Sequence, residues 1–142
     1  MALSERIPPG AIHQPETREE VALHRFLLGA AEGNAADGLI DYVIALEALL
    51  LPERSEGELR FRLALFGAHY VGHSLDERRR LFRNFQTVYD VRSGLVHGAK
   101  RSSHDEIQAA VRLARHLAAA VMLKGLDTGW PTQEQLRDLV LD

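Results

Sequence analysis

The chain has 142 residues, which suffice for one domain with a buried core. Its composition, 46% hydrophobic and 26% charged, is typical of a soluble globular protein; the lack of cysteine excludes disulfides and thiolate metal sites, and no apolar run is long enough to cross a bilayer. The net charge of −3 argues against a protein that coats nucleic acid by bulk electrostatics, and a cytoplasmic protein is the simplest interpretation.

The first 15 residues differ in composition from the rest of the chain. They contain Pro8, Pro9, Gly10 and Pro15, and such a segment cannot hold a helix because proline lacks the backbone donor and clashes with the preceding turn. We expect residues 1–15 to be an extended lead-in or a linker from an upstream domain. Residues 16–142 are expected to form a single helical domain.

Signals for helix starts recur after this segment. In a capping box, a Ser or Thr stands three residues before a Glu or Gln, and each side chain accepts a hydrogen bond from a backbone N–H of the first turn. Matches occur at 17–20, 55–58, 74–77, 103–106 and 132–135. Together with the apolar periodicity, they predict helices over 18–31, 35–51, 56–71, 75–93, 105–124 and 133–141.

The apolar spacing also predicts which helix faces are buried. In the first helix the expected inward residues are Val21, Leu23, His24, Leu27 and Leu28. The second helix has a wide apolar stripe made of Leu39, Ile40, Val43, Leu46, Leu49 and Leu50. No run alternates with the period of two that is typical of a half-buried strand. We therefore predict an all-α, up-and-down bundle of four to five main helices plus a short C-terminal helix.

The most informative stretch is 88–100, which reads V-Y-D-V-R-S-G-L-V-H-G-A-K. Arg92 and His97 are five residues apart, so on an unbroken helix they would point about 140° away from each other. Gly94 favours the left-handed conformation that ends helices. We expect the helix to end near Ser93 or Gly94, so that the turn 95–98 folds His97 back toward Arg92. An Arg–His pair of this kind can hold a phosphodiester and move protons near neutral pH.

Arg92 continues the apolar face of its helix, where a charge is costly unless it is paired or hydrated. Glu47, in the most apolar helix, is the expected partner, and it is expected to orient Arg92 rather than to act in catalysis. Arg62 is the other candidate cation for Glu47. An alternative stays open, in which Arg92 makes a structural ion pair or caps helix carbonyls.

Three residues flank this motif. Tyr89 is expected to lie in the core, and Asp90 is expected to be solvated or paired with an arginine. Ser93 could donate a hydrogen bond to a phosphate or help to end the helix.

Residues 74–104 hold seven bases and three acids and form the basic region of an acidic chain. By composition alone the run of arginines at 78–80 and 83 is a solvated helix face. Because this run and the pair at 100–101 lie on either side of the Arg92 motif, a confined anionic substrate is favoured over long duplex binding. The candidates for RNA binding are Arg78, Arg79, Arg83, Lys100 and Arg101.

His69 and His73 have the spacing of a helical metal pair. Gly72 and the capping signal at Ser74 predict that the helix ends before His73, and no nearby acid completes a triad. We expect neither a metal nor a cofactor.

These residues together resemble the HEPN domains, and in particular the Apea-like group. The resemblance rests on A-L-E-A-L-L at 45–50, on Arg62 and Ala68 in the next helix, and on Y-D-V-R-S-G-L-V-H-G at 89–98; it covers about residues 36–125. It implies a helical bundle that dimerises so that two Arg–His pairs meet in one cleft. It also implies metal-independent RNA cleavage that leaves a 2′,3′-cyclic phosphate.

In that family Arg92 would bind the scissile phosphate and His97 would be the general acid or base. Glu47, Ser93, Asp90 and Tyr89 would support them. The expected function is an RNA endonuclease of the toxin or anti-phage defence type. The expected partners are RNA, with tRNA as one option, or a nucleotide, a second copy of the chain, and an antitoxin or an upstream sensor domain, with no membrane. Two alternatives stay open: a non-catalytic module that binds a nucleotide or RNA or serves to dimerise, and a buried polar network that only stabilises the bundle.

Overall fold

The structure is a computed structural model, and it describes residues 17–51, 58–98 and 102–141. This part of the chain contains helices and no strand, which confirms the predicted all-α bundle. The helices are α1 (Arg18–Ala31), α2 (Ala35–Leu50), α3 (Leu59–Val71), α4 (Leu75–His97), α5 (His104–Thr128) and α6 (Gln133–Leu141). The predicted lead-in and the capping signal at Ser55 lie outside the described residues.

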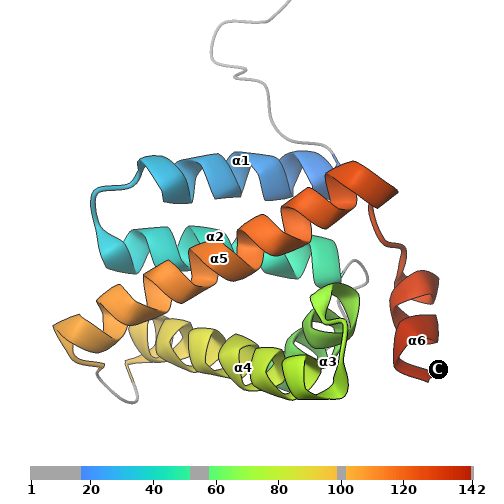
Figure 1. Ribbon diagram of the computed structural model, residues 1–142. Helices are drawn as coiled ribbons and strands as arrows, with labels where there is room; N and C mark the ends of the chain where they lie inside the picture. Colours follow the sequence, from blue (N-terminus) through green and yellow to red (C-terminus); the bar gives the residue numbers. More distant parts are fainter. Residues whose placement is uncertain (1–16, 52–57, 99–101, 142) are drawn as a thin grey trace, which may run out of the picture.

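The helices are arranged around α2. In Figure 1, α1 and α2 form an antiparallel pair, α5 crosses in front of them, α4 lies below, and α3 and α6 lie at the right. Most of the surface of α2 is apolar, and Leu39, Val43, Leu46 and Leu50 are fully buried. A helix of this kind must be covered on most sides, since each buried leucine contributes about 1.5–3 kcal/mol.

None of the helices in the described part of the chain has both the length and the apolar character needed to span a bilayer.

The predicted inward face of α1 is largely wrong, because only Val21 of its five residues is half-buried and His24 is exposed. Leu23, Leu27 and Leu28 are 49%, 57% and 41% exposed, and Ala22 and Gly29 are buried instead. A Cβ atom added to Gly29 would lie 2.9 Å from the ring of Tyr42 on α2. The small residues thus let α1 approach α2 closely, and this close packing determines which face is buried.

A charged pair also joins these two helices. Arg25 Nη1 lies 3.0 Å from Oδ1 of Asp41, and Asp41 is buried among apolar residues of α2. Removing the arginine would leave a buried carboxylate without its cation.

The start signals are largely confirmed. The side chains of Thr17, Ser74 and Ser103 accept hydrogen bonds from the backbone N–H three residues later, and Ser103 and Glu106 form the full reciprocal box. Before α6, Thr132 and Gln135 exchange the same two bonds at 3.1 and 3.0 Å. Asn34, which the Ser/Thr pattern does not include, caps α2.

The predicted end of α5 at Gly125 is wrong, because the helix continues to Thr128. A Cβ atom on Gly125 would lie 2.2 Å from the indole of Trp130, so this glycine lets the indole pack on α5 rather than ending the helix. Trp130 also packs against the core, which anchors the connection to α6.

We expect stability to fall at alkaline pH because of Tyr42. This side chain is buried between α1 and α2, and burial raises the pKa of its phenol while Arg115 lowers it in part. The folded protein therefore keeps the phenolic proton to higher pH than the unfolded chain does. The stabilisation that the neutral Tyr42 phenol contributes is fully present below about pH 10 and is lost as the pH rises through the folded pKa. Urea unfolding of wild type and Tyr42→Phe at pH 8 and pH 10.5 measures the effect.

The Tyr42→Phe protein should lose less free energy of unfolding between these two pH values than the wild type does. Some loss is expected to persist, because burial also raises the pKa of Tyr70. Equal losses in the two proteins would show that Tyr42 does not carry the effect.

Candidate functional site

Arg92 lies at a pocket of about 470 Å³ between α1, α2 and α4. We call it the Arg92 pocket, and its lining consists of Arg18, Val21, Ile44, Glu47, Ala48, Leu51 and Arg92. Val88 and Phe85, one and two turns before Arg92 on the same face of α4, are fully buried. This register carries the Arg92 side chain inward. Its Nε is buried and has no hydrogen-bond partner among the described residues.

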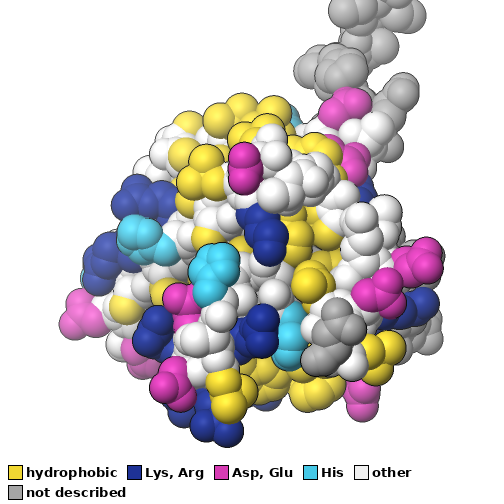
Figure 2. Space-filling model, turned by 45° about the vertical axis from the view of Figure 1, so that its right-hand side comes forward, with side chains coloured by type: hydrophobic (Ala, Val, Ile, Leu, Met, Phe, Trp, Pro, Cys, Tyr) yellow, Lys and Arg dark blue, Asp and Glu magenta, His cyan; other side chains and the backbone are white. Residues whose placement is uncertain are grey.

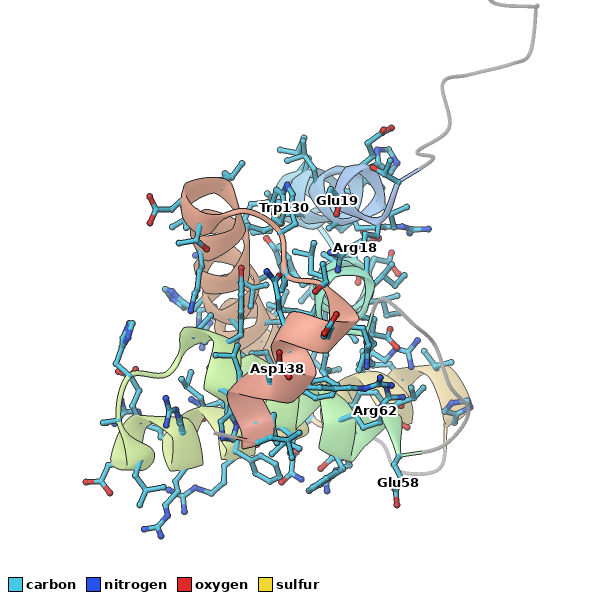
Figure 3. All side chains as sticks on the ribbon, turned by 90° about the vertical axis from the view of Figure 1, so that its right-hand side faces the viewer. Arg18, Glu19, Glu58, Arg62, Trp130 and Asp138 are labelled. Carbon is cyan, nitrogen blue, oxygen red and sulfur yellow. The ribbon has the colours of Figure 1, made fainter. Side chains whose placement is uncertain are left out.

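Glu47 also lines the Arg92 pocket. It is 7% exposed, as expected for an acid on the most apolar helix. The structure thus brings the predicted pair of residues, 45 positions apart in the sequence, to one place. Arg62, the other candidate cation, lies on α3 with its guanidinium 5.8 Å from the centroid of the Phe66 ring (Figure 3).

Arg18 is a residue of this pocket that the sequence did not indicate. Its Nη1 donates to the carbonyl of Leu49 at 3.3 Å, its Nη2 donates to the carbonyl of Pro131, and its Nε lies 3.0 Å from Glu19. Figure 3 shows it beside the connection that contains Trp130. The residue next to a capping threonine is normally exposed, so no sequence signal pointed to it.

The predicted end of the fourth helix near Ser93 or Gly94 is wrong. The helix α4 continues to His97, and Gly98 ends it with a left-handed backbone at φ 67°. Because α4 continues through Gly94, Leu95, which lies one turn after Val91, packs against the core. That contact outweighs the cost of about 1 kcal/mol for a glycine inside a helix.

The turn that was expected to fold His97 back toward Arg92 therefore does not form. On the continuous helix the two residues point about 140° apart. His97 is exposed, and it does not line the Arg92 pocket. A single subunit thus places the two predicted catalytic residues near one end of α4 but on different sides of it.

The flanking residues take separate positions. Tyr89 packs against the core, and Ser93 is half-buried within α4. Both carboxylate oxygens of Asp90 accept hydrogen bonds from Arg60, at 2.6 and 2.9 Å, and the bond raises the pKa of Arg60. The expectation that Asp90 is solvated or pairs with an arginine is confirmed, and this pair lies on the solvent side of α3 and α4.

Three of the RNA-binding candidates come together. Arg78, Arg79 and Arg83 line a second pocket, between α3 and α4, and Lys100 and Arg101 lie outside the described residues. On the face shown in Figure 2, Lys, Arg and His side chains lie at the left and below, interspersed with acidic ones, while an apolar patch covers the top.

The histidine pair at 69 and 73 does not share a helix, because α3 ends at Val71 as the sequence predicted. Nδ1 of His69 lies 2.9 Å from the Leu65 carbonyl, and His73 is exposed. Within the described ranges there is no group of three or more His, Asp or Glu side chains that could hold a metal ion.

The geometry supplies a cation with a buried donor that has no acceptor among the described residues, and a carboxylate, Glu47, that lines the same pocket. A guanidinium can bind an anionic oxygen, and its geometry matches both carboxylate and phosphate groups. Comparison of the chain with family models, with curated proteins and with solved structures gives no match.

Proposed function

We propose that the protein is a homodimeric, metal-independent RNA endonuclease of the toxin or anti-phage defence type. The observation that carries this proposal is the Nε of Arg92, which is buried at an open pocket and lacks an acceptor among the described residues. A buried donor without a partner costs about 1–3 kcal/mol. A phosphate oxygen in the pocket would remove this cost. The resemblance of residues 89–98 to the HEPN motif supports the same reading.

The site is completed by His97 of a second subunit. Within one subunit the continuous α4 holds His97 about 140° away from Arg92, and the imidazole is exposed. Residues that diverge in one subunit can converge across a two-fold axis, where each subunit gives one residue to each of two equivalent sites. The exposed end of α4 is then part of the dimer contact.

In the proposed reaction the 2′-hydroxyl of the RNA attacks the adjacent phosphorus. The O2′–P bond forms and the P–O5′ bond breaks, which leaves a 2′,3′-cyclic phosphate and a 5′-hydroxyl. Arg92 stabilises the negative charge that develops on the phosphate oxygens, and His97 takes the 2′ proton or gives a proton to the leaving oxygen. Glu47 positions Arg92.

Incubation of RNA with the purified protein in EDTA tests this function. Single-stranded RNA and tRNA should be cleaved to products with cyclic phosphate ends, and Arg92→Ala and His97→Ala should each lower the rate at least about 100-fold. Arg80→Ala, which changes an exposed arginine on the same helix, is the matched control and should keep the wild-type rate. Intact RNA with the wild type, or equal cleavage by all variants, would exclude the proposal.

A second candidate function is favoured by the same continuous helix. If His97 does not meet Arg92 in any assembly, the Arg92 pocket serves only to bind a nucleotide or RNA end, or the protein serves as a dimerisation module. RNA binding without turnover, lost in Arg92→Ala, would identify the binding module. A sharply lower melting temperature of Arg92→Ala, with no RNA binding by the wild type, would indicate that Arg92 is structural.

A further inference from the structure

A second pocket, separate from the Arg92 pocket, lies between the end of α3 and the first turns of α4. We call it the α3–α4 pocket; its volume is about 330 Å³ and its lining consists of Ala68, His69, Leu75, Arg78, Arg79, Phe82 and Arg83. The two pockets share no residue. The lining contains three arginines and a histidine but no acid, which is unusual for a chain whose net charge is −3.

The three arginines have no ion-pair partner among the described residues. Within the described ranges no carboxylate lies within 4.0 Å of Arg78, Arg79 or Arg83, whereas Arg80, in the same run but outside the pocket, lies 4.0 Å from Glu77. The Nε of Arg78 is buried and, among the described residues, has no acceptor. The arginine stem is held against Gly72, where an added Cβ would lie 2.6 Å from its Cγ. Three cations that repel one another thus line one pocket, with no anion within ion-pair distance among the described residues, and Arg78 is the one that packing holds in place.

The remaining lining is apolar and aromatic. Phe82 is half-buried, and its ring packs edge-on against Phe61 with 5.9 Å between centroids, which holds the ring in place. Leu75 is largely exposed at the mouth of the pocket. Nδ1 of His69 must carry a proton, because its neighbour, the Leu65 carbonyl, can only accept. The Nε2 of this ring is therefore the nitrogen left for a ligand.

We propose that the α3–α4 pocket binds a phosphate monoester attached to a flat ring, as in a nucleotide. A phosphate monoester is a dianion and matches several unpaired guanidinium groups, which stay charged at all physiological pH values. The ring packs on Phe82 and Leu75. A volume of about 330 Å³ lies at the lower end of small-molecule sites, so the pocket accepts one nucleotide and excludes a duplex.

The same group is found on a free nucleotide and at the 5′ end of an RNA strand. Binding at this pocket needs neither Arg92 nor His97, so the inference does not depend on the proposed cleavage. The α3–α4 pocket is a second ligand site at the N-terminal half of α4, whereas Arg92 lies in the C-terminal half.

Calorimetry with the full chain at 150 mM salt tests the inference. Phenyl phosphate, which has one ring and one phosphate monoester, should bind the wild type, and phenol should not. Arg79→Ala and Arg83→Ala remove exposed side chains that the fold does not need, and each should weaken binding about tenfold. Arg80→Ala, which changes an arginine outside the pocket, should bind like the wild type.

Two further binding measurements distinguish a free nucleotide from an RNA 5′ end as the source of the phosphate. Tight binding of adenosine 5′-monophosphate, with no difference between 5′-phosphorylated and 5′-hydroxyl RNA, supports a free nucleotide as the ligand. Preferential binding of the 5′-phosphorylated RNA, lost in Arg83→Ala, supports an RNA end. Failure of phenyl phosphate to bind, or equal weakening by Arg80→Ala and the pocket variants, would overturn the inference, because bulk charge would then explain any binding.

Discussion

A heterodimer of one Arg92→Ala subunit and one His97→Ala subunit is expected to regain the RNA cleavage that each variant homodimer has lost. If each site takes Arg92 from one subunit and His97 from the other, this heterodimer has one site with both residues intact. Its rate should then be about half that of the wild-type dimer, which has two sites. Co-expression with two different affinity tags gives the heterodimer, and RNA cleavage in EDTA gives the rate.

The matched control pairs a wild-type subunit with an Arg92→Ala/His97→Ala subunit. It contains the same two substitutions, but each of its shared sites lacks one residue, so it should be inactive. A site made within a single subunit gives the opposite results: the control would keep about half the activity and the first heterodimer would be inactive. The continuous α4, which separates Arg92 from His97 in one subunit, is the reason to expect the shared site.

Replacing Phe85 by alanine should lower the free energy of unfolding by about 3–5 kcal/mol, the range for a large aromatic side chain in a packed core. Phe85 is fully buried on α4, and its ring lies so close to Gly67 that an added Cβ there would be 2.4 Å away. Because the Phe85 ring contacts the backbone of α3 directly, α3 and α4 cannot easily move together to fill the cavity that its removal leaves. Urea unfolding monitored by circular dichroism measures the change.

Phe61→Ala is the control for this prediction. Its ring is 48% exposed and contacts the edge of Phe82, so its loss should cost about 1 kcal/mol or less. Equal costs for Phe85→Ala and Phe61→Ala would mean that the contact between α3 and α4 is not the tightly packed part of the core.

The fold could be predicted from the sequence because its main signals are local. Each of Thr17, Ser74 and Ser103 bonds to the N–H three residues on, and this bond depends on no other part of the chain. The apolar stripe of α2 was equally clear, and the predicted residues Leu39, Val43, Leu46, Leu49 and Leu50 are all buried.

What the sequence could not predict depends on contacts between helices. Glycines 94 and 125 were expected to end their helices, but both helices continue past them. After Gly94, Leu95 packs on the core, and at Gly125 the indole of Trp130 packs on the glycine itself. The face of α1 was wrong for the same reason: Ala22 and Gly29 contribute little to an apolar pattern but allow the closest approach to α2.

The candidate site was predicted in part. A charged residue on an apolar helix face is a signal that spacing can find, and both Arg92 and Glu47 were found in this way and line one pocket. Arg18 has no such signal, because its role depends on carbonyl groups of Leu49 and Pro131 that only the folded chain brings to it.

The Arg18 contact with Pro131 has a consequence for the kinetics of folding. It joins residues 113 positions apart, so it closes nearly the whole described chain into one loop. Contacts between helices that are neighbours in sequence, such as α1 with α2 and α3 with α4, close much shorter loops and can form earlier. A contact that forms after the rate-limiting step leaves the folding rate unchanged and lowers the unfolding rate. We therefore expect the Arg18 contact to prolong the lifetime of the folded state by slowing unfolding.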